Sequence, residues 1–108
     1  MDTKFNDLSQ AEILILKSLQ SGQKLYGLEI RKAIEETFGR AFNFSTLYPK
    51  LELLQAKGFI AGEESNDTLQ KGTNARRKYF KITGAGSQVL SDWEFAYAAV
   101  GNYGLQGA

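Results

Sequence analysis

The chain has 108 residues, of which 43% are hydrophobic and 23% charged, as is typical of one soluble globular domain. It contains no cysteine and no histidine, which excludes disulfides and both thiolate and histidine-based catalysis. The first residues form no signal-peptide pattern, and the apolar run at 13–16 is far too short to span a bilayer. These features predict a cytoplasmic protein that is not an enzyme and uses no metal or cofactor.

The net charge of +1 conceals an uneven distribution of charge. Residues 40–81 hold eight of the 13 basic side chains but only four of the 12 acidic ones, so this stretch carries +4 and the remainder −3. A positive surface of this kind is what a nucleic-acid-binding protein needs.

The first two predicted helices have recognisable boundaries. Ser9 and Glu12 precede an apolar run with the spacing of a capping box, so a helix begins there and ends near Gly22, which forms a left-handed C-terminal cap. A second helix fits residues 26–38 and stops at Gly39. Its apolar positions at helical spacing are Leu28, Ile30, Ala33, Ile34 and Phe38.

A third helix is predicted from Ser45 to the residue before Gly58. Pro49 falls in its first turn, where a missing N–H costs little. One apolar stripe consists of Leu47, Leu51 and Leu54. The opposite side carries Thr46, Tyr48, Lys50, Glu52 and Lys57.

The hydrophobic period then changes from helical to alternating. Residues 59–61 can start a strand, and residues 76–82 alternate as a second strand. The polar stretch 65–74 between them is predicted to be a loop. Thr83 can cap a last amphipathic helix that reaches about Val100, followed by a frayed tail.

These elements predict an α+β fold, mostly α, in a single domain over residues 1–108. Three helices and a two-stranded wing form a winged helix-turn-helix over residues 8–83, followed by a C-terminal helix at 84–100 and a tail at 101–108. Gly84-Ala85-Gly86 imitates a dinucleotide-binding loop, but Val89 replaces its third glycine. Close packing at Gly86 explains the motif better.

Three motifs in this order resemble the PadR family of transcriptional regulators. They are YGLEI at 26–30, TLYPKL at 46–51, and RKYFKIT followed by GAG at 77–86. The resemblance implies a winged-helix homodimer that binds an operator as a repressor. It also implies a short, PadR-like member in which the N-terminal helix and the last helix form the dimer interface.

Two groups of residues are candidates for contact with double-stranded DNA. The first lies at the start of the third helix, where N–H groups and the helix dipole favour phosphate: Ser45, Thr46, Tyr48 and Lys50. The second lies on the wing: Lys71, Arg76, Arg77 and Lys78. The alternatives are that Ser45 only caps, that Tyr48 only packs, and that the wing charges only protect a strand edge.

The last helix is rich in aromatic residues, which suits a dimer interface. Its apolar side is formed by Leu90, Trp93, Tyr97 and Val100. A second interpretation is a small aromatic effector stacked on Trp93 between subunits, which would make the repressor ligand-responsive. A third is that the winged helix binds protein partners instead of DNA.

Overall fold

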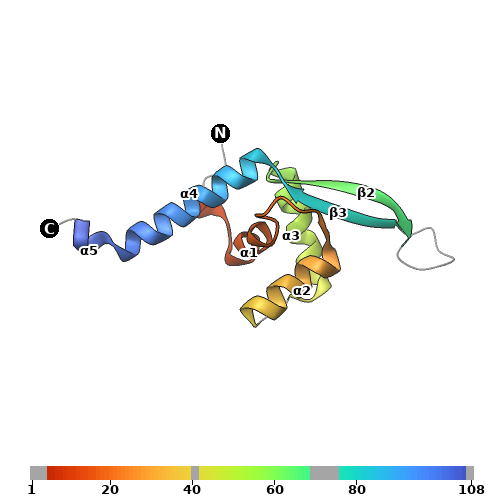
Figure 1. Cartoon of the computed structure of the whole chain (residues 1–108), viewed down its shortest axis with the longest axis horizontal. Helices are drawn as coiled ribbons and strands as arrows, with labels where there is room; N and C mark the ends of the chain where they lie inside the picture. The colour runs from red at the N-terminus through yellow and green to blue at the C-terminus, as the bar shows by residue number, and fades with distance from the viewer. Residues whose placement is uncertain (1–4, 40–41, 69–75, 107–108) are drawn as a thin grey trace.

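A group of three helices forms the centre of the molecule, and a hairpin and a long helix extend from it in opposite directions (Figure 1). The computed structural model describes residues 5–39, 42–68 and 76–106. Its elements are η1 (Phe5–Asp7), α1 (Gln10–Ser18), β1 (Leu25–Tyr26), α2 (Gly27–Phe38), α3 (Phe44–Ala56), β2 (Ile60–Thr68), β3 (Arg76–Ile82), α4 (Gly84–Gly101) and α5 (Tyr103–Gln106). The predicted winged helix-turn-helix followed by a C-terminal helix is confirmed.

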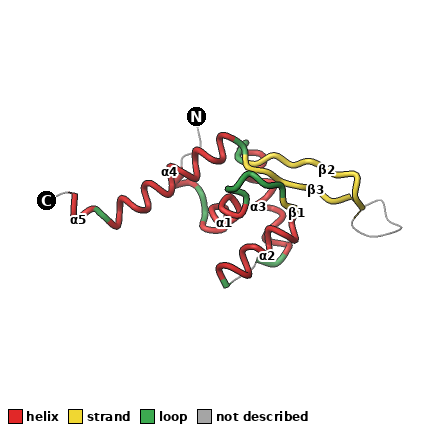
Figure 2. The backbone as a smooth tube through the Cα atoms, in the orientation of Figure 1, coloured by secondary structure: helices red, strands yellow, loops and turns green. Residues whose placement is uncertain are grey.

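The core lies where α1, α2 and α3 meet the base of the hairpin and the first turns of α4 (Figure 2). The large side chains buried almost completely are Ile15, Leu16, Leu19, Ile30, Leu47, Leu51, Leu54, Ile60 and Leu90. The predicted stripe of α3 is therefore the face that joins the core. Burial of each such side chain stabilises the fold by roughly 1.5–3 kcal/mol.

The capping box at the start of α1 is confirmed in both directions. The backbone N–H of Ser9 donates to Glu12 Oε1 at 2.8 Å, and the N–H of Glu12 donates to Ser9 Oγ at 3.2 Å. Gly22 adopts the predicted left-handed conformation, with a φ of 90°, but it does not cap the helix, because α1 ends at Ser18 and Leu19 is the capping residue. Backbone N–H groups at this end donate hydrogen bonds to carbonyls three residues earlier, which tightens the last turn. Burial of Leu19 holds this turn against the core.

Helix α2 ends as predicted at Gly39, whose φ of 81° is the left-handed conformation that glycine adopts at low cost. Its buried face is narrower than predicted. Ile30 and Ile34 are buried, whereas Leu28 and Phe38 are exposed. Leu28 lies about 160° around the helix from Ile30, and Phe38 is the last residue of α2, beyond the width of the core.

Helix α3 begins one residue earlier than predicted, because Asn43 caps it rather than Ser45. The N–H of Thr46 donates to Asn43 Oδ1 at 3.0 Å, and the Ser45 hydroxyl donates to the same oxygen at 2.7 Å. Pro49 is consequently the sixth residue of α3 and not part of its first turn. Since proline has no N–H, it cannot donate to the carbonyl of Ser45.

In the described residues the sheet has three antiparallel strands, in the order β1-β3-β2, rather than the two predicted. Strand β1 pairs Leu25 with Phe80 and Tyr26 with Tyr79. A strand of two residues is too short to show alternation, so no pattern in the sequence predicts it. Strand β2 continues to Thr68, into part of the predicted loop, with an irregularity after Glu64. The rest of that loop, 69–74, lies outside the described residues.

Helix α4 starts at the predicted cap. Thr83 Oγ1 accepts from the N–H of Gly86 at 3.0 Å and donates to the carbonyl of Gly58 at 2.7 Å. Close packing at Gly86 is confirmed, since a Cβ there would lie 2.1 Å from the carbonyl oxygen of Phe59. Within the predicted tail, residues 103–106 form the short helix α5, and residues 107–108 lie outside the described residues. Within the described residues, no helix combines the length and apolarity needed to cross a membrane.

Candidate nucleic-acid interface

The amino end of α3 presents polar side chains on the side away from the core. Ser45, Thr46 and Tyr48 are exposed, and Lys50 is half-buried. Thr46 and Lys50 lie one turn apart, so they occupy one flank of the helix. The positive end of the helix dipole lies at the same place. Hydroxyls, an ammonium group and a helix amino end together favour an anionic ligand such as phosphate.

Tyr48 takes part in a cluster that no motif of the sequence predicted. Its ring stacks on Phe44 with centroids 5.6 Å apart, and the Arg31 guanidinium carbon lies 5.2 Å from the centroid of Phe44. The spacing of Phe44 and Tyr48, four residues apart in a helix, could have revealed their contact. Arg31 belongs to α2, and no local pattern predicts its approach.

An ion pair between α1 and the end of α3 holds the orientation of α3. Lys57 Nζ donates to Glu12 Oε2 at 3.0 Å, and Glu12 is only 2% exposed. Burial alone raises the pKa of Glu12, but hydrogen bonds from Ser9 and Lys57 and the charge of Lys57 outweigh it, so this pKa lies below its ordinary value. Lys57 thus neutralises an internal carboxylate and adds no charge to the outer side of α3.

The hairpin separates the predicted wing residues. Arg77 places its guanidinium carbon 4.5 Å from the centroid of the Tyr26 ring, on one face of β3. Lys78 lies on the other face, where its Nζ is 5.6 Å from the centroid of the Phe80 ring. Neighbouring residues of a strand point to opposite faces, as the sequence predicted.

The remaining wing candidates are described only in part or not at all. Arg76 opens β3, but its side chain is not among those described, and Lys71 lies outside the described residues. Acidic side chains offset some of the charge near the base of the hairpin. Lys24 Nζ lies 3.5 Å from Glu63 Oε1, and Glu64 lies opposite Lys78 in the register of β2 and β3.

The C-terminal candidates do not share one environment. Leu90 is buried in the core, Trp93 is half-buried, and Tyr97 and Val100 are exposed. Trp93 and Tyr97 stack with their centroids 4.9 Å apart. Because Leu90 already packs inside the monomer, only the other three offer surface to a partner or ligand.

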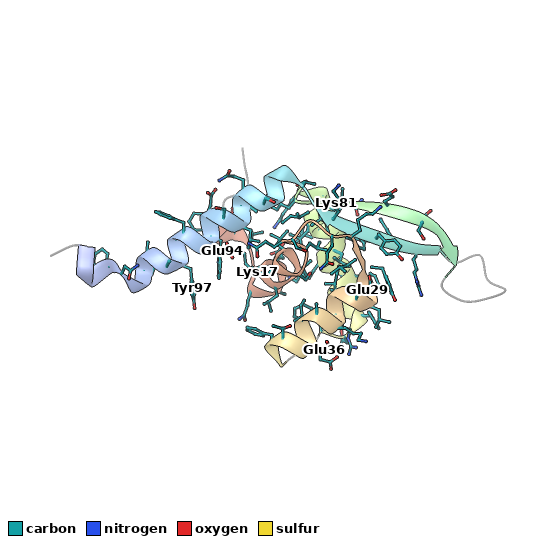
Figure 3. All side chains as sticks on the ribbon, in the orientation of Figure 1. Lys17, Glu29, Glu36, Lys81, Glu94 and Tyr97 are labelled. Atoms are coloured by element: carbon teal, nitrogen blue, oxygen red, sulfur yellow. The ribbon has the colours of Figure 1, made fainter. Side chains whose placement is uncertain are left out.

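A groove of about 700 Å³ runs between α1, α2 and α4 beside this stack. Phe38 of α2 and Leu14 of α1 contribute to its apolar lining. Lys17 of α1 forms an ion pair with Glu94 of α4 at its edge, and Tyr97 lies beside this pair (Figure 3). In the described part of the chain, no cluster of three or more His, Cys, Asp or Glu side chains could hold a metal ion.

Three helices followed by an antiparallel hairpin, with an exposed amino end on the third helix, define a winged helix-turn-helix protein. The model of the PadR-like family of transcriptional regulators matches residues 15–92. The negative transcriptional regulator PadR of Bacillus subtilis is 33% identical over 81 residues, which cover 73% of this chain. The chain belongs to the PadR-like family.

Solved structures of the family are similar in fold. The crystal structure of a PadR family transcriptional regulator from Eggerthella lenta has a TM-score of 0.70 and 27% identity, covering 84% of this chain and 74% of that one. The structure of Bacillus subtilis PadR in complex with operator DNA has a TM-score of 0.67 and 30% identity. The match covers 79% of this chain and 46% of that one. The chain spans 42% of the length of the curated Bacillus regulator.

Proposed function

We propose that the chain is a sequence-specific DNA-binding repressor that acts in the cytoplasm as a homodimer on an inverted-repeat operator. The observation that carries the proposal is the exposed amino end of α3, where hydroxyls and Lys50 gather on the side away from the core. A helix in this position of a helix-turn-helix enters the major groove. The complex of Bacillus subtilis PadR with operator DNA supports the same use of the fold.

The candidates on α3 and those on the hairpin have different roles in this proposal. Ser45 and Thr46 contact phosphates or base edges near the helix terminus, and Lys50 reaches a phosphate or a guanine edge. Lys78 binds the flanking backbone without reading sequence. The same role is proposed for Lys71 and Arg76. Arg77 is held against Tyr26 at the base of the hairpin, so it contacts only DNA that approaches this face.

The second half of α4 supplies the dimer contact in this proposal. Tyr97 and Val100 lie on one side of the helix and are exposed, and Phe95 and Tyr103 add further exposed apolar area. Exposed aromatic side chains concentrated on one helix are typical of an interface. A twofold dimer would place two α3 helices on half-sites about one helical turn of DNA apart.

The test is a mobility-shift titration of the protein against DNA upstream of its own gene, at two salt concentrations and with nonspecific competitor. A retarded band that survives competitor and weakens steeply with salt is the expected result. Lys50→Ala should weaken binding by about tenfold, because it removes one charge-assisted contact.

Two results would contradict the proposal. One is the absence of any shift at low salt for a protein that light scattering finds to be a folded dimer, which would favour protein partners for the winged helix. The other is an equal affinity of Lys50→Ala and the parent for operator DNA.

A second candidate function, response to a small aromatic effector, is favoured by the groove beside the Trp93–Tyr97 stack. A planar ligand could extend this stack between apolar walls. Trp93 is the only tryptophan, so a bound ligand should quench the protein's tryptophan fluorescence. If the ligand is an effector, it must also change the affinity for DNA by linkage. Quenching without a change in DNA affinity would show that the ligand binds but is not an effector.

A further inference from the structure

The aromatic cluster at the amino end of α3 leaves an apolar ring exposed in a polar setting. Phe44 and Tyr48 stack at 5.6 Å with an interplanar angle of 26°, yet Phe44 is 41% exposed and Tyr48 47%. Their neighbours Ser45 and Thr46 are also exposed. Core packing therefore does not account for a phenylalanine at this position.

Three contacts restrain the cluster. Arg31 Nε donates to the carbonyl of Phe42 at 2.6 Å, which fixes the turn before α3, and its guanidinium lies over the Phe44 ring. The hydroxyl of Tyr48 packs against Gly27, where a Cβ would lie 2.5 Å from that oxygen. A side chain that is already held in place loses less conformational entropy when it binds.

We propose that Phe44 is a specificity-determining residue that contacts the C5 methyl group of a thymine in the operator. The inference rests on the proposed function, in which the amino end of α3 lies in the major groove. Among the base edges exposed there, the thymine methyl is the apolar group, and the others present hydrogen-bond donors or acceptors. Phenylalanine has neither donor nor acceptor, so it can discriminate only by apolar contact. Tyr48 is a positioning residue that acts through Phe44.

The test replaces the thymines of an operator half-site one at a time with deoxyuridine, which removes only the methyl group. The parent protein should lose affinity at one position by about fourfold, the factor expected from burial of one methyl-sized group. Phe44→Ala should bind the thymine operator more weakly and should distinguish thymine from uracil at that position by less than about twofold.

Two variants serve as controls. Phe44→Leu keeps an apolar side chain and should retain part of the discrimination. Leu53→Ala removes an apolar side chain that is equally exposed, at 42%, but lies about 180° around α3 from Phe44. It should retain the full sensitivity to uracil at the position assigned to Phe44, even if the overall affinity changes, because Leu53 lies on the flank of Thr46. Thermal unfolding of each variant establishes that α3 is still folded.

The possible failures are distinguishable. If the parent binds the operator specifically but no uracil substitution lowers its affinity, the inference is overturned and the proposed function stands. The same holds if Phe44→Ala remains as sensitive to uracil as the parent, because Phe44 then only stabilises the helix end. If the parent binds no DNA above competitor, the proposed function fails and the inference fails with it.

Discussion

Two residues hold the first turn of α4 and the end of α3 against each other. Gly86 lies so close to the carbonyl of Phe59 that no side chain fits between them. Thr83 caps α4 and also donates to the carbonyl of Gly58. The junction between the hairpin and the last helix therefore depends on backbone contacts rather than on large side chains.

Substitution of Gly86 should consequently be costly. Gly86→Ala places a methyl group against backbone, which cannot rotate away, so we expect a loss of about 2–3 kcal/mol in the free energy of unfolding. Gly84→Ala is the matched control, since a Cβ there meets open space. Urea denaturation measures the free energy of unfolding of both variants. A loss below that of Gly84→Ala would contradict the close approach.

The ion pair of Glu12 and Lys57 predicts a pH dependence of stability. Because the pKa of Glu12 is lowered in the folded state, its contribution is present above the unfolded pKa and is lost as the pH falls through the folded pKa. Glu12→Gln should lower the thermal midpoint at pH 7, and the difference from the parent should shrink below about pH 4. Melting curves between pH 3 and pH 7, a range of about four units, would test this. A difference that is independent of pH would contradict it.

At the scale of elements, α3 and the β2–β3 hairpin differ in how they are supported. Helix α3 is fixed by its buried leucines, by the Asn43 cap and by the pair of Lys57 with Glu12. The hairpin extends away from the core (Figure 1) and is held by its strand pairing and by Phe80 and Ile82 at its base. A rigid helix and a projecting hairpin suit different tasks, reading base edges and following a phosphate backbone.

A charge deletion on the hairpin should therefore affect affinity without affecting specificity. Lys78→Ala is expected to weaken binding to all duplexes alike and to reduce the slope of log affinity against log salt by about 1. Binding measured at four or more salt concentrations, roughly 50 to 200 mM, gives this slope. Loss of discrimination between operator and competitor with an unchanged slope would contradict a backbone contact.

At the scale of the whole molecule, the most conspicuous feature is the long helix α4, which leaves the core after Leu90 and exposes apolar side chains. A monomer gains nothing from an exposed Val100 at 77% or from an exposed Tyr97. Association of two copies through this helix would bury them and would join two α3 helices into one DNA-binding unit.

Disruption of this surface should yield a folded monomer. Val100→Glu places a charge where the monomer has room, so the fold should persist while the dimer dissociates and operator affinity falls about tenfold or more. Ser91→Glu adds the same charge about 160° around α4 from Trp93 and should remain dimeric. Light scattering gives the mass of each variant. A dimeric Val100→Glu protein would place the interface elsewhere.

The sequence alone determined the order of the four long helices and the two long strands, and several of their ends. Three of these ends are marked by local signals, each of which depends on residues within one turn. They are the capping box of Ser9 and Glu12, the C-terminal cap of α2 at Gly39 and the N-terminal cap of α4 at Thr83. The strand at 76–82 was predicted with the same bounds for the same reason, since alternation is a property of neighbouring residues.

Tertiary structure decided what depends on residues distant in sequence. Strand β1 exists because β3 offers it a partner, and α1 ends early because Leu19 is drawn into the core. Lys57 does not contribute to the outer side of α3, because it pairs with Glu12, 45 residues earlier in the chain. Phe44 is exposed there instead, with Arg31 of α2 over its ring. Periodicity states which side of a helix is apolar, but only packing decides which polar and aromatic side chains remain available to a partner.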